Sequence, residues 1–140
     1  MKNNNGFTLI ELIVVIALIA GLSALAIPIY FSFQIEVQLD NTTAEITQTL
    51  RRAQAKTLAG EQDKAWGVSF TTSSYTLYAT GGPGFNELEI IPITLTLSGL
   101  SNVEFNRLTG KTTDTGNITV TASSINKTKA ISVNSEGRVE

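Results

Sequence analysis

The feature that most constrains this chain is an apolar run near its N-terminus that contains a single charged residue. Between Phe7 and Ile27 the only ionisable side chain is that of Glu11. As a helix with a rise of 1.5 Å per residue, this run is about 30 Å long, which matches the hydrocarbon core of a bilayer. The run therefore predicts a membrane-spanning helix. Glu11 needs a partner there, because a carboxylate in hydrocarbon costs about 2.5 to 3.5 kcal/mol.

Cleavage between Gly6 and Phe7 would supply that partner. The new amino group would carry a positive charge one helical turn before Glu11, and residues at i, i+4 spacing share a helix face. The positive end of the helix dipole favours a carboxylate at the same place. In a lone subunit the carboxylate would pair with its own amine. In a stack of axially offset subunits it could meet the amine of the next subunit, and it would then set the register.

Two other interpretations of the apolar run stay open. A secretory signal peptide cut after Ala26, where "ALA" fits the small-x-small rule, would release a soluble β domain that begins at Ile27. A plain transmembrane anchor is the second interpretation. Neither explains Glu11, and Pro28 follows the signal-peptide cut at an unusual position.

Composition argues against most catalytic and metal sites. The chain has 140 residues with no histidine and no cysteine. This removes Ser-His-Asp relays, thiol nucleophiles, disulfides and the usual zinc sites. The carboxylates show no calcium-loop spacing, and only a Ser-Lys or paired-carboxylate site remains as a catalytic alternative. We predict that the protein is not an enzyme and binds no metal or cofactor.

Beyond Pro28 the pattern predicts an amphipathic helix over residues 29–60. Its apolar stripe consists of Ile35, Leu39, Ile46, Leu50 and Ala53, at spacings of three, four and seven residues, and of Leu58. Gly60 is the predicted C-cap. Between Gly21 and Pro28 the helix is expected to be continuous but weakened, because proline removes a backbone hydrogen bond and glycine lowers helix propensity.

A basic cluster lies near the end of this helix. Arg51, Arg52 and Lys56 would complement the negative helix C-terminus. A DNA-binding patch would need more basic residues on the same face and exposed aromatic residues. The net charge of −2 also gives no general attraction to phosphate backbones. Nucleic acid is therefore kept only as an alternative partner.

After Gly60 the apolar period changes to two, which predicts short antiparallel strands over residues 61–140. A hairpin is predicted from two alternating runs around "TTSS", which are Trp66, Val68 and Phe70, then Tyr75, Leu77 and Ala79. "GGPG" at residues 81–84 predicts a loop. Further strands are predicted around Ile93, Leu95 and Leu97, Val103 and Phe105, Ile118 and Val120, and Ile131 and Val133.

One apolar face on each strand requires a cover, and the helix stripe can supply it. We therefore predict an α+β fold in which a long N-terminal α-helix packs on a small antiparallel β-sheet. Half of the helix would span the membrane and half would be amphipathic.

The segment "GFTLIELIVVIALIAGLSALAIP" resembles the class III signal of type IV pilins and type II secretion pseudopilins. The resemblance rests on Gly6, then Phe7, a glutamate fifth after the cut, and a proline that ends the span. It implies a pilin fold, cleavage by prepilin peptidase between Gly6 and Phe7, and N-methylation of Phe7. It further implies an assembly role for Glu11 and a helix break at Pro28.

This resemblance implies four parts of the chain: a leader peptide at 1–6, a transmembrane assembly helix at 7–28, an amphipathic helix at 29–60 and a β-sheet domain at 61–140. The implied protein crosses the inner membrane once and later moves into a pilus or pseudopilus. Lys2 in the polar leader favours a cytoplasmic N-terminus, with the C-terminal part outside the cytoplasm. The implied partners are prepilin peptidase, the inner membrane, and other pilin or pseudopilin subunits packed through the helix.

The C-terminal half carries a second resemblance, to the GspH/FimT family of minor pseudopilins and minor pilins. It rests on "TLRRAQAKTLAG", "VEFNRLTGKT" and "ISVNSEGRVE", the last of which contains Gly137 and Arg138. The implied function is that of a minor pilin or pseudopilin in a type II secretion pseudopilus or type IV pilus. A major type IV pilin and a DNA-capturing minor pilin of a competence system are the alternatives within this class.

Overall fold

The computed structural model describes residues 6–80 and 86–140, without the side chains of residues 25–27. The chain forms two compact units, one that ends at Gln34 and one that comprises Ile35–Glu140. We call the second unit the head. The predicted GGPG loop and all of the predicted leader except Gly6 lie outside the described residues.

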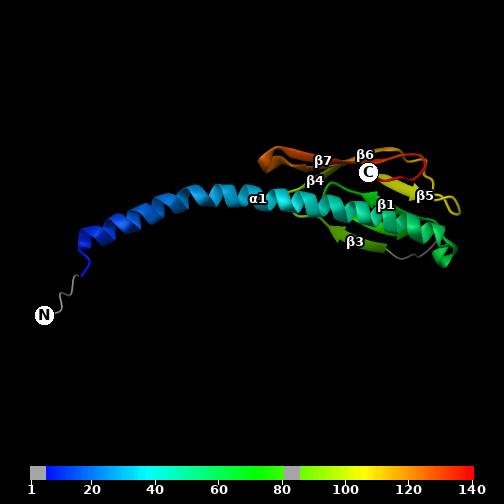
Figure 1. Cartoon of the computed structure of the whole chain (residues 1–140). Helices are drawn as coiled ribbons and strands as arrows, with labels where there is room; N and C mark the ends of the chain where they lie inside the picture. Colours follow the sequence, from blue (N-terminus) through cyan, green and yellow to red (C-terminus); the bar gives the residue numbers. More distant parts are fainter. Residues whose placement is uncertain (1–5, 81–85) are drawn as a thin grey trace. The chain divides into compact units, whose positions relative to one another are not determined.

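The first unit consists of the N-terminal part of helix α1 (Leu9–Leu58) and the residues before it (Figure 1). The large apolar side chains that the structure describes in this unit are exposed, namely Phe7, Leu9, Ile10, Leu12, Ile13, Val14, Val15, Ile16, Leu18, Ile19, Leu22, Ile29, Tyr30, Phe31 and Phe33. A helix that is apolar on every face has no polar side to turn toward water. Within the described residues, α1 is the one helix long and apolar enough to cross a membrane.

Helix α1 continues across Pro28, as the sequence predicts. Two serine hydroxyls in this region bond within the helix. Ser23 Oγ donates to the carbonyl of Ile19 at 2.8 Å, and Ser32 Oγ donates to the carbonyl of Pro28 at 3.1 Å. Both hydroxyls are thereby satisfied without water, as an apolar environment requires.

In the head, α1 buries the predicted apolar stripe. Leu39, Ile46, Leu50 and Ala53 are almost fully buried, and Ile35 packs partly against the same core. The prediction was wrong for Leu58, which is 54% exposed, while Thr57 is fully buried. Position 57 continues the three- and four-residue spacing from Leu50 and Ala53, and position 58 lies one residue past it.

Thr57 closes the junction between α1 and the first strand. Its Oγ1 accepts the backbone N–H of Trp66 at 2.9 Å. Gly60 follows with a left-handed φ of 64°, and its N–H donates to the carbonyl of Thr57 at 3.1 Å. This confirms Gly60 as the C-cap of the helix. A short 3₁₀ turn, η1 (Glu61–Asp63), then leads into the sheet.

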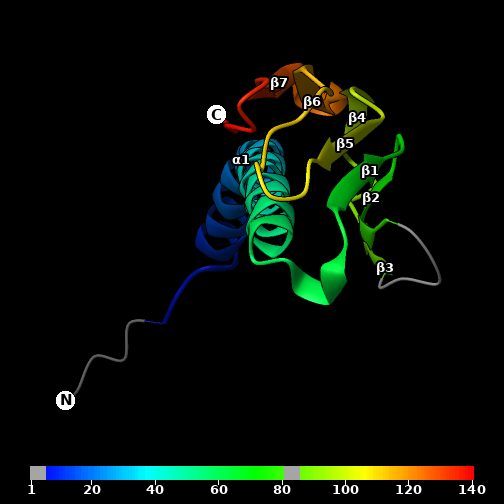
Figure 2. The ribbon, with the colours of Figure 1, turned by 90° about the vertical axis from the view of Figure 1, so that its right-hand side faces the viewer.

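The strands form two antiparallel sheets where one was predicted. The four-stranded sheet has the order β3-β2-β1-β5 and consists of β1 (Trp66–Phe70), β2 (Ser74–Ala79), β3 (Asn86–Ile90) and β5 (Asn102–Phe105). The three-stranded sheet has the order β4-β6-β7 and consists of β4 (Thr96–Gly99), β6 (Gly116–Ala122) and β7 (Lys127–Val133), with η2 (Ser123–Ile125) between β6 and β7. Figure 2 shows both sheets beside the cyan-to-green part of α1.

The predicted hairpin is confirmed as β1 and β2, with Trp66 opposite Ala79 and Phe70 opposite Tyr75. All six of its alternating apolar residues are buried. Ile93 was wrongly predicted to share a strand face with Leu95 and Leu97. It is fully exposed, because the chain turns where the N–H of Leu95 donates to the carbonyl of Pro92 at 2.9 Å.

Candidate functional site

The first turn of α1 carries a capped helix start. The carbonyl of Thr8 accepts the N–H of Leu12 at 3.2 Å, and Thr8 Oγ1 accepts the N–H of Glu11 at 3.3 Å. Thr8 is therefore the N-cap. The Thr-x-x-Glu spacing is that of a capping box, in which the glutamate side chain reaches back toward the N-cap. This role of Thr8 was missed in the prediction, although the spacing itself signals it.

Gly6 and Phe7 lie ahead of the helix. Phe7 is 86% exposed, and a Cβ placed on Gly6 would meet no atom within 4 Å. The helix begins at Leu9, two residues later than an i, i+4 pairing of Phe7 with Glu11 needs. Phe7 instead directly precedes the N-cap. Its amino group would still lie at the helix end toward which a capping-box glutamate reaches.

Glu11 is an isolated charge on an apolar surface. It is exposed, and it is the one charged residue among residues 6–35. Its carboxylate forms no salt bridge within the part of the chain that the structure describes. No group of His, Cys, Asp or Glu in that part could hold a metal ion. Glu11 therefore has no counter-charge among the described residues.

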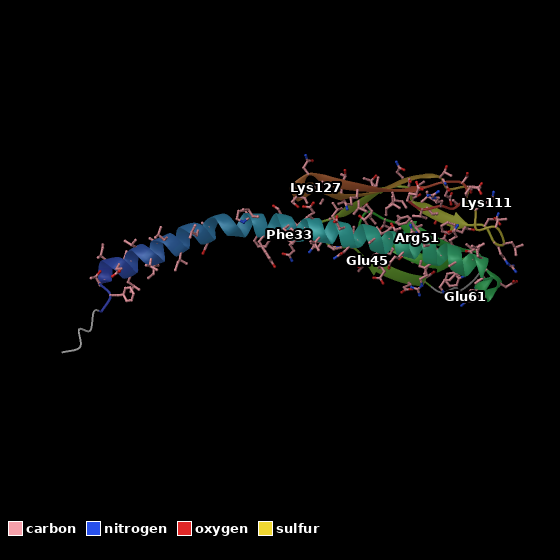
Figure 3. The ribbon with its side chains drawn as sticks, in the orientation of Figure 1. Phe33, Glu45, Arg51, Glu61, Lys111 and Lys127 are labelled. Carbon is pink, nitrogen blue, oxygen red and sulfur yellow. The ribbon has the colours of Figure 1, made fainter. Side chains whose placement is uncertain are left out.

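The basic cluster of α1 makes contacts within the head. Figure 3 labels Arg51 on the head part of α1. Its Nη2 donates to the carbonyl of Val139 at 3.2 Å. Arg52 lies 3.0 Å from a carboxylate oxygen of Glu87. Lys56 pairs with Glu61 at 2.5 Å, and its Nζ lies 4.3 Å from the ring centroid of Trp66. These cations link the helix to β3, η1 and the C-terminal segment.

The motifs that resemble the GspH/FimT family meet at the end of α1. Gln54 Nε2 donates to the carbonyl of Gly110 at 2.9 Å. Gly137 has a φ of 78°, and a Cβ on it would lie 2.2 Å from that same carbonyl oxygen. A side chain at position 137 is therefore excluded by the backbone of the 106–111 turn. Gly110 and Gly137 therefore allow the backbone of these motifs to lie close to α1.

The last residues of the chain return along β7. Val133 and Val139 form an antiparallel bridge, and the backbones of Ser132 and Glu140 exchange hydrogen bonds of 2.8 and 3.0 Å. Asn134 Oδ1 accepts the N–H of Arg138 at 2.9 Å and shapes the turn. Together these bonds cover the outer edge of β7.

The outer face of the four-stranded sheet carries a polar hydrogen-bond network. Tyr78 Oη donates to Asn102 Oδ1 at 2.7 Å, and Asp114 Oδ2 accepts the N–H of Glu104 at 2.9 Å. Burial raises the pKa of the Tyr78 phenol above its usual value of 10.0, although the hydrogen bond to Asn102 opposes the shift. The tyrosine ring lies over Gly67, where a Cβ would be 2.8 Å from Oη. These contacts hold three strands together and give Tyr78 a structural role.

Comparison with known proteins points to the same N-terminal region. Residues 1–27 match the family model described as the prokaryotic N-terminal methylation motif. A fimbrial protein of Pseudomonas aeruginosa is 33% identical over 82 residues, which cover 53% of each chain. The type IV major fimbrial protein FimA of Dichelobacter nodosus is 37% identical over 81 residues, which cover 58% of this chain and 51% of FimA.

The chain is therefore similar to type IV pilins. It spans about half the length of the curated relatives that it matches. No solved structure matches it significantly. The predicted resemblance to type IV pilins and the α+β fold are confirmed. The narrower resemblance to GspH/FimT stays a prediction, and so do the roles of Gly6, Phe7, Glu11 and Pro28.

Proposed function

We propose that this pilin-like chain is a structural subunit that assembles into a type IV pilus or a type II secretion pseudopilus through the N-terminal part of α1. One observation carries the proposal. This part of α1 exposes apolar side chains on every face, and among residues 9–34 it has a single charge, Glu11, in the first turn. Such a surface is stable in a bilayer or among similar helices, but not in water. The methylation motif and the fimbrial relatives support the same function.

In this proposal, prepilin peptidase cuts between Gly6 and Phe7, and Phe7 is then N-methylated. Gly6 has no neighbouring atom near its Cβ position, and Phe7 is exposed, so the bond between them is open to an enzyme. Before assembly the subunit crosses the inner membrane once, with the head outside the cytoplasm. The cut removes the polar leader and leaves a positive amine beside the N-cap Thr8.

Glu11 then acts as a register device. A lone subunit in the bilayer pairs the carboxylate with its own amine, which the capped first turn brings to the same helix end. In a filament the carboxylate pairs with the amine of a neighbouring subunit. A buried charge pair discriminates between axial positions better than an apolar surface that can slide.

Mass spectrometry of the protein from a host with prepilin peptidase tests the processing step. We expect a mature chain that starts at N-methylated Phe7. Gly6→Ala should leave the full-length precursor in the membrane, because the peptidase must accept the backbone at this position. A mature N-terminus at Ile27 would instead support the secreted β domain and reject the pilin function.

The variant Glu11→Gln tests the register. It should be processed and remain in the membrane, but its co-purification with filaments should fall about tenfold, since loss of an ion pair worth roughly 1.4 kcal/mol has that effect. Glu45→Gln is the matched control, because Glu45 is exposed on the head part of α1. Normal incorporation of Glu11→Gln would reject the register role.

The finer assignment is to a minor pilin or pseudopilin, which the resemblance of residues 103–112 and 131–140 to the GspH/FimT family supports. A major pilin is the second candidate, because one relative is named a type IV major fimbrial protein. The abundance of the protein in sheared filaments separates the two.

The DNA-capturing alternative is tested by a gel-shift assay at low salt. The intramolecular contacts of Arg51, Arg52 and Lys56 make this alternative less favourable.

A further inference from the structure

We propose that Tyr30, Phe31 and Phe33 form an anchor in the headgroup region of the bilayer and fix the insertion depth of the unassembled subunit. We call these three residues the aromatic band. The inference rests on the proposed function of a membrane-resident subunit. It adds a lipid-binding surface to a part of α1 outside the first turn.

The length of the apolar helix is the first argument. Residues 9–33 form an uncharged helix apart from Glu11, and at 1.5 Å per residue they extend about 37 Å. The hydrocarbon core is about 30 Å thick, and each headgroup layer adds roughly 5 to 7 Å. The surplus of about 7 Å therefore equals one headgroup layer. Polar residues begin directly after the band, with Gln34 and Glu36.

The chemistry of the band suits that layer. Aromatic rings with a polar tip concentrate at membrane interfaces, and Tyr30 has this character. The rings of Tyr30 and Phe31 meet edge to face, with centroids 6.4 Å apart and an interplanar angle of 67°. The one hydroxyl between the phenylalanines, that of Ser32, is already bonded to the carbonyl of Pro28. The band therefore combines apolar area with a single phenolic group.

The distribution of the band around the helix distinguishes a lipid layer from a protein partner. Tyr30, Phe31 and Phe33 are 66%, 57% and 65% exposed, and the preceding Ile29 is 72% exposed. At about 100° per residue, these four positions spread over roughly 200° of the circumference. A helix that packs on a core presents a stripe of about 100°. The wide spread fits a surrounding medium, and the medium at this depth is the headgroup layer.

The experiment uses the full-length chain, whose lack of cysteine allows a single spin label at any chosen position. Labels are placed at Leu18, Ile29 and Thr128, which are all exposed. The labelled proteins are reconstituted in phosphatidylcholine vesicles, and collision rates are measured with oxygen and with a nickel chelate. We expect the label at Ile29 to meet nickel at least about threefold less often than Thr128, and oxygen about twofold less often than Leu18, as at an interface.

A variant with alanine at all three band positions tests the anchor itself. It should shift the nickel accessibility of the Leu18 label by about twofold, because the helix can then move along the membrane normal. The matched control has alanine at Leu88, Ile90 and Ile93, which are exposed apolar residues of the head. The control should leave the Leu18 label unchanged. Emission from the buried Trp66 reports that the head is folded in both variants.

Each contrary outcome has a distinct meaning. If the Ile29 label is as accessible to nickel as Thr128 while Leu18 is protected, the chain is in the membrane and the anchor is rejected. If the Ile29 label is shielded from both oxygen and nickel, a protein surface covers the band and the lipid anchor is equally rejected. If Leu18 itself meets nickel as freely as Thr128, the proposed membrane-resident subunit fails as well.

Discussion

The two parts of α1 present opposite surfaces within one helix. In the first unit Leu18 is 62% exposed, and the other large apolar side chains described there are exposed as well. In the head Leu50 is fully buried, and the buried apolar residues of α1 occupy one stripe. The backbone hydrogen bonds are of the same type in both parts. The difference lies in what covers the side chains, because the head supplies its own core and the first unit relies on its surroundings.

This contrast shows that the two parts of α1 are stabilised by different surroundings. The head stabilises its half of α1 by burying Ile46, Leu50 and Ala53 against both sheets. The first unit has no such core, so its apolar area contributes to stability only in lipid or among similar helices.

The largest effect is expected when the two units are separated by truncation. A truncated chain that starts at Ile35 should fold and stay soluble without detergent, while the full-length chain should need detergent or lipid. The reason is that the buried core consists of residues of the head. Size-exclusion chromatography and thermal unfolding followed by circular dichroism measure both properties. An unfolded truncated chain would show that the first unit contributes to the core.

A matched pair of substitutions in α1 compares the two surfaces directly. Leu50→Ala should lower the free energy of unfolding of the head by about 2 to 5 kcal/mol, because it removes a fully buried side chain and leaves a cavity. Leu18→Ala should change it by less than about 0.5 kcal/mol. Urea unfolding in detergent, followed by Trp66 emission, measures both values. Similar losses in the two variants would contradict the division into units.

Substitution of two glycines by alanine should change stability in opposite directions in the two units. Gly67→Ala should destabilise the head by about 1 to 3 kcal/mol, because the new Cβ would lie 2.8 Å from both Tyr78 Oη and the carbonyl oxygen of Val103. Gly21→Ala meets no atom within 4 Å, and it should stabilise the helix by up to about 1 kcal/mol. Thermal unfolding and far-ultraviolet circular dichroism test the two variants. A neutral Gly67→Ala would mean that the sheet can relax around the ring.

The smallest expected effect is a dependence of the stability of the head on pH. Burial raises the pKa of Tyr78 above 10.0, so the unfolded state loses its proton at lower pH than the folded state. The stability linked to this group is complete below pH 10 and falls as the pH rises through the folded-state value. Tyr78→Phe should make the decline above pH 10 shallower, although loss of the bond to Asn102 costs about 1 kcal/mol at neutral pH.

Tyr75 adds to this decline, because burial also raises its pKa. Some alkaline sensitivity should therefore remain in Tyr78→Phe. The matched control is Tyr30→Phe in the first unit, which should leave the unfolding of the head unchanged. Denaturant unfolding between pH 8 and about pH 11 measures these slopes. An unaltered slope in Tyr78→Phe would assign the alkaline effect to other groups.

The sequence was most informative where one face is buried. Strict alternation predicted the pairing of β1 with β2 and the burial of Trp66 and Leu77, because a slip of one residue would expose all of them. β3 was missed because its alternating pattern places Leu88 and Ile90 on an exposed face and glutamates on the other. Period alone also could not assign the strands to two sheets, since that depends on contacts distant in sequence.

The candidate site shows a similar division. Gly6, Phe7 and Glu11 could be named as candidates because their order and spacing are specific, and they lie within the residues that match the methylation motif. Their local geometry could not be derived from a helical period, because Phe7 precedes the first helical residue. Thr8 was overlooked because its hydroxyl acts on the backbone of Glu11 and makes no contact that an apolar pattern would reveal.

The proline inside α1 has a mechanical consequence. Pro28 has no N–H to offer the carbonyl of Ala24, so under tension the helix should yield first around this turn, ahead of the head. If residues 21–28 changed from helix to extended chain, each would gain about 1.8 Å, and one subunit would lengthen by about 14 Å. In a filament of the proposed kind, such a gain in every subunit would allow reversible stretch under load while each head kept its fold.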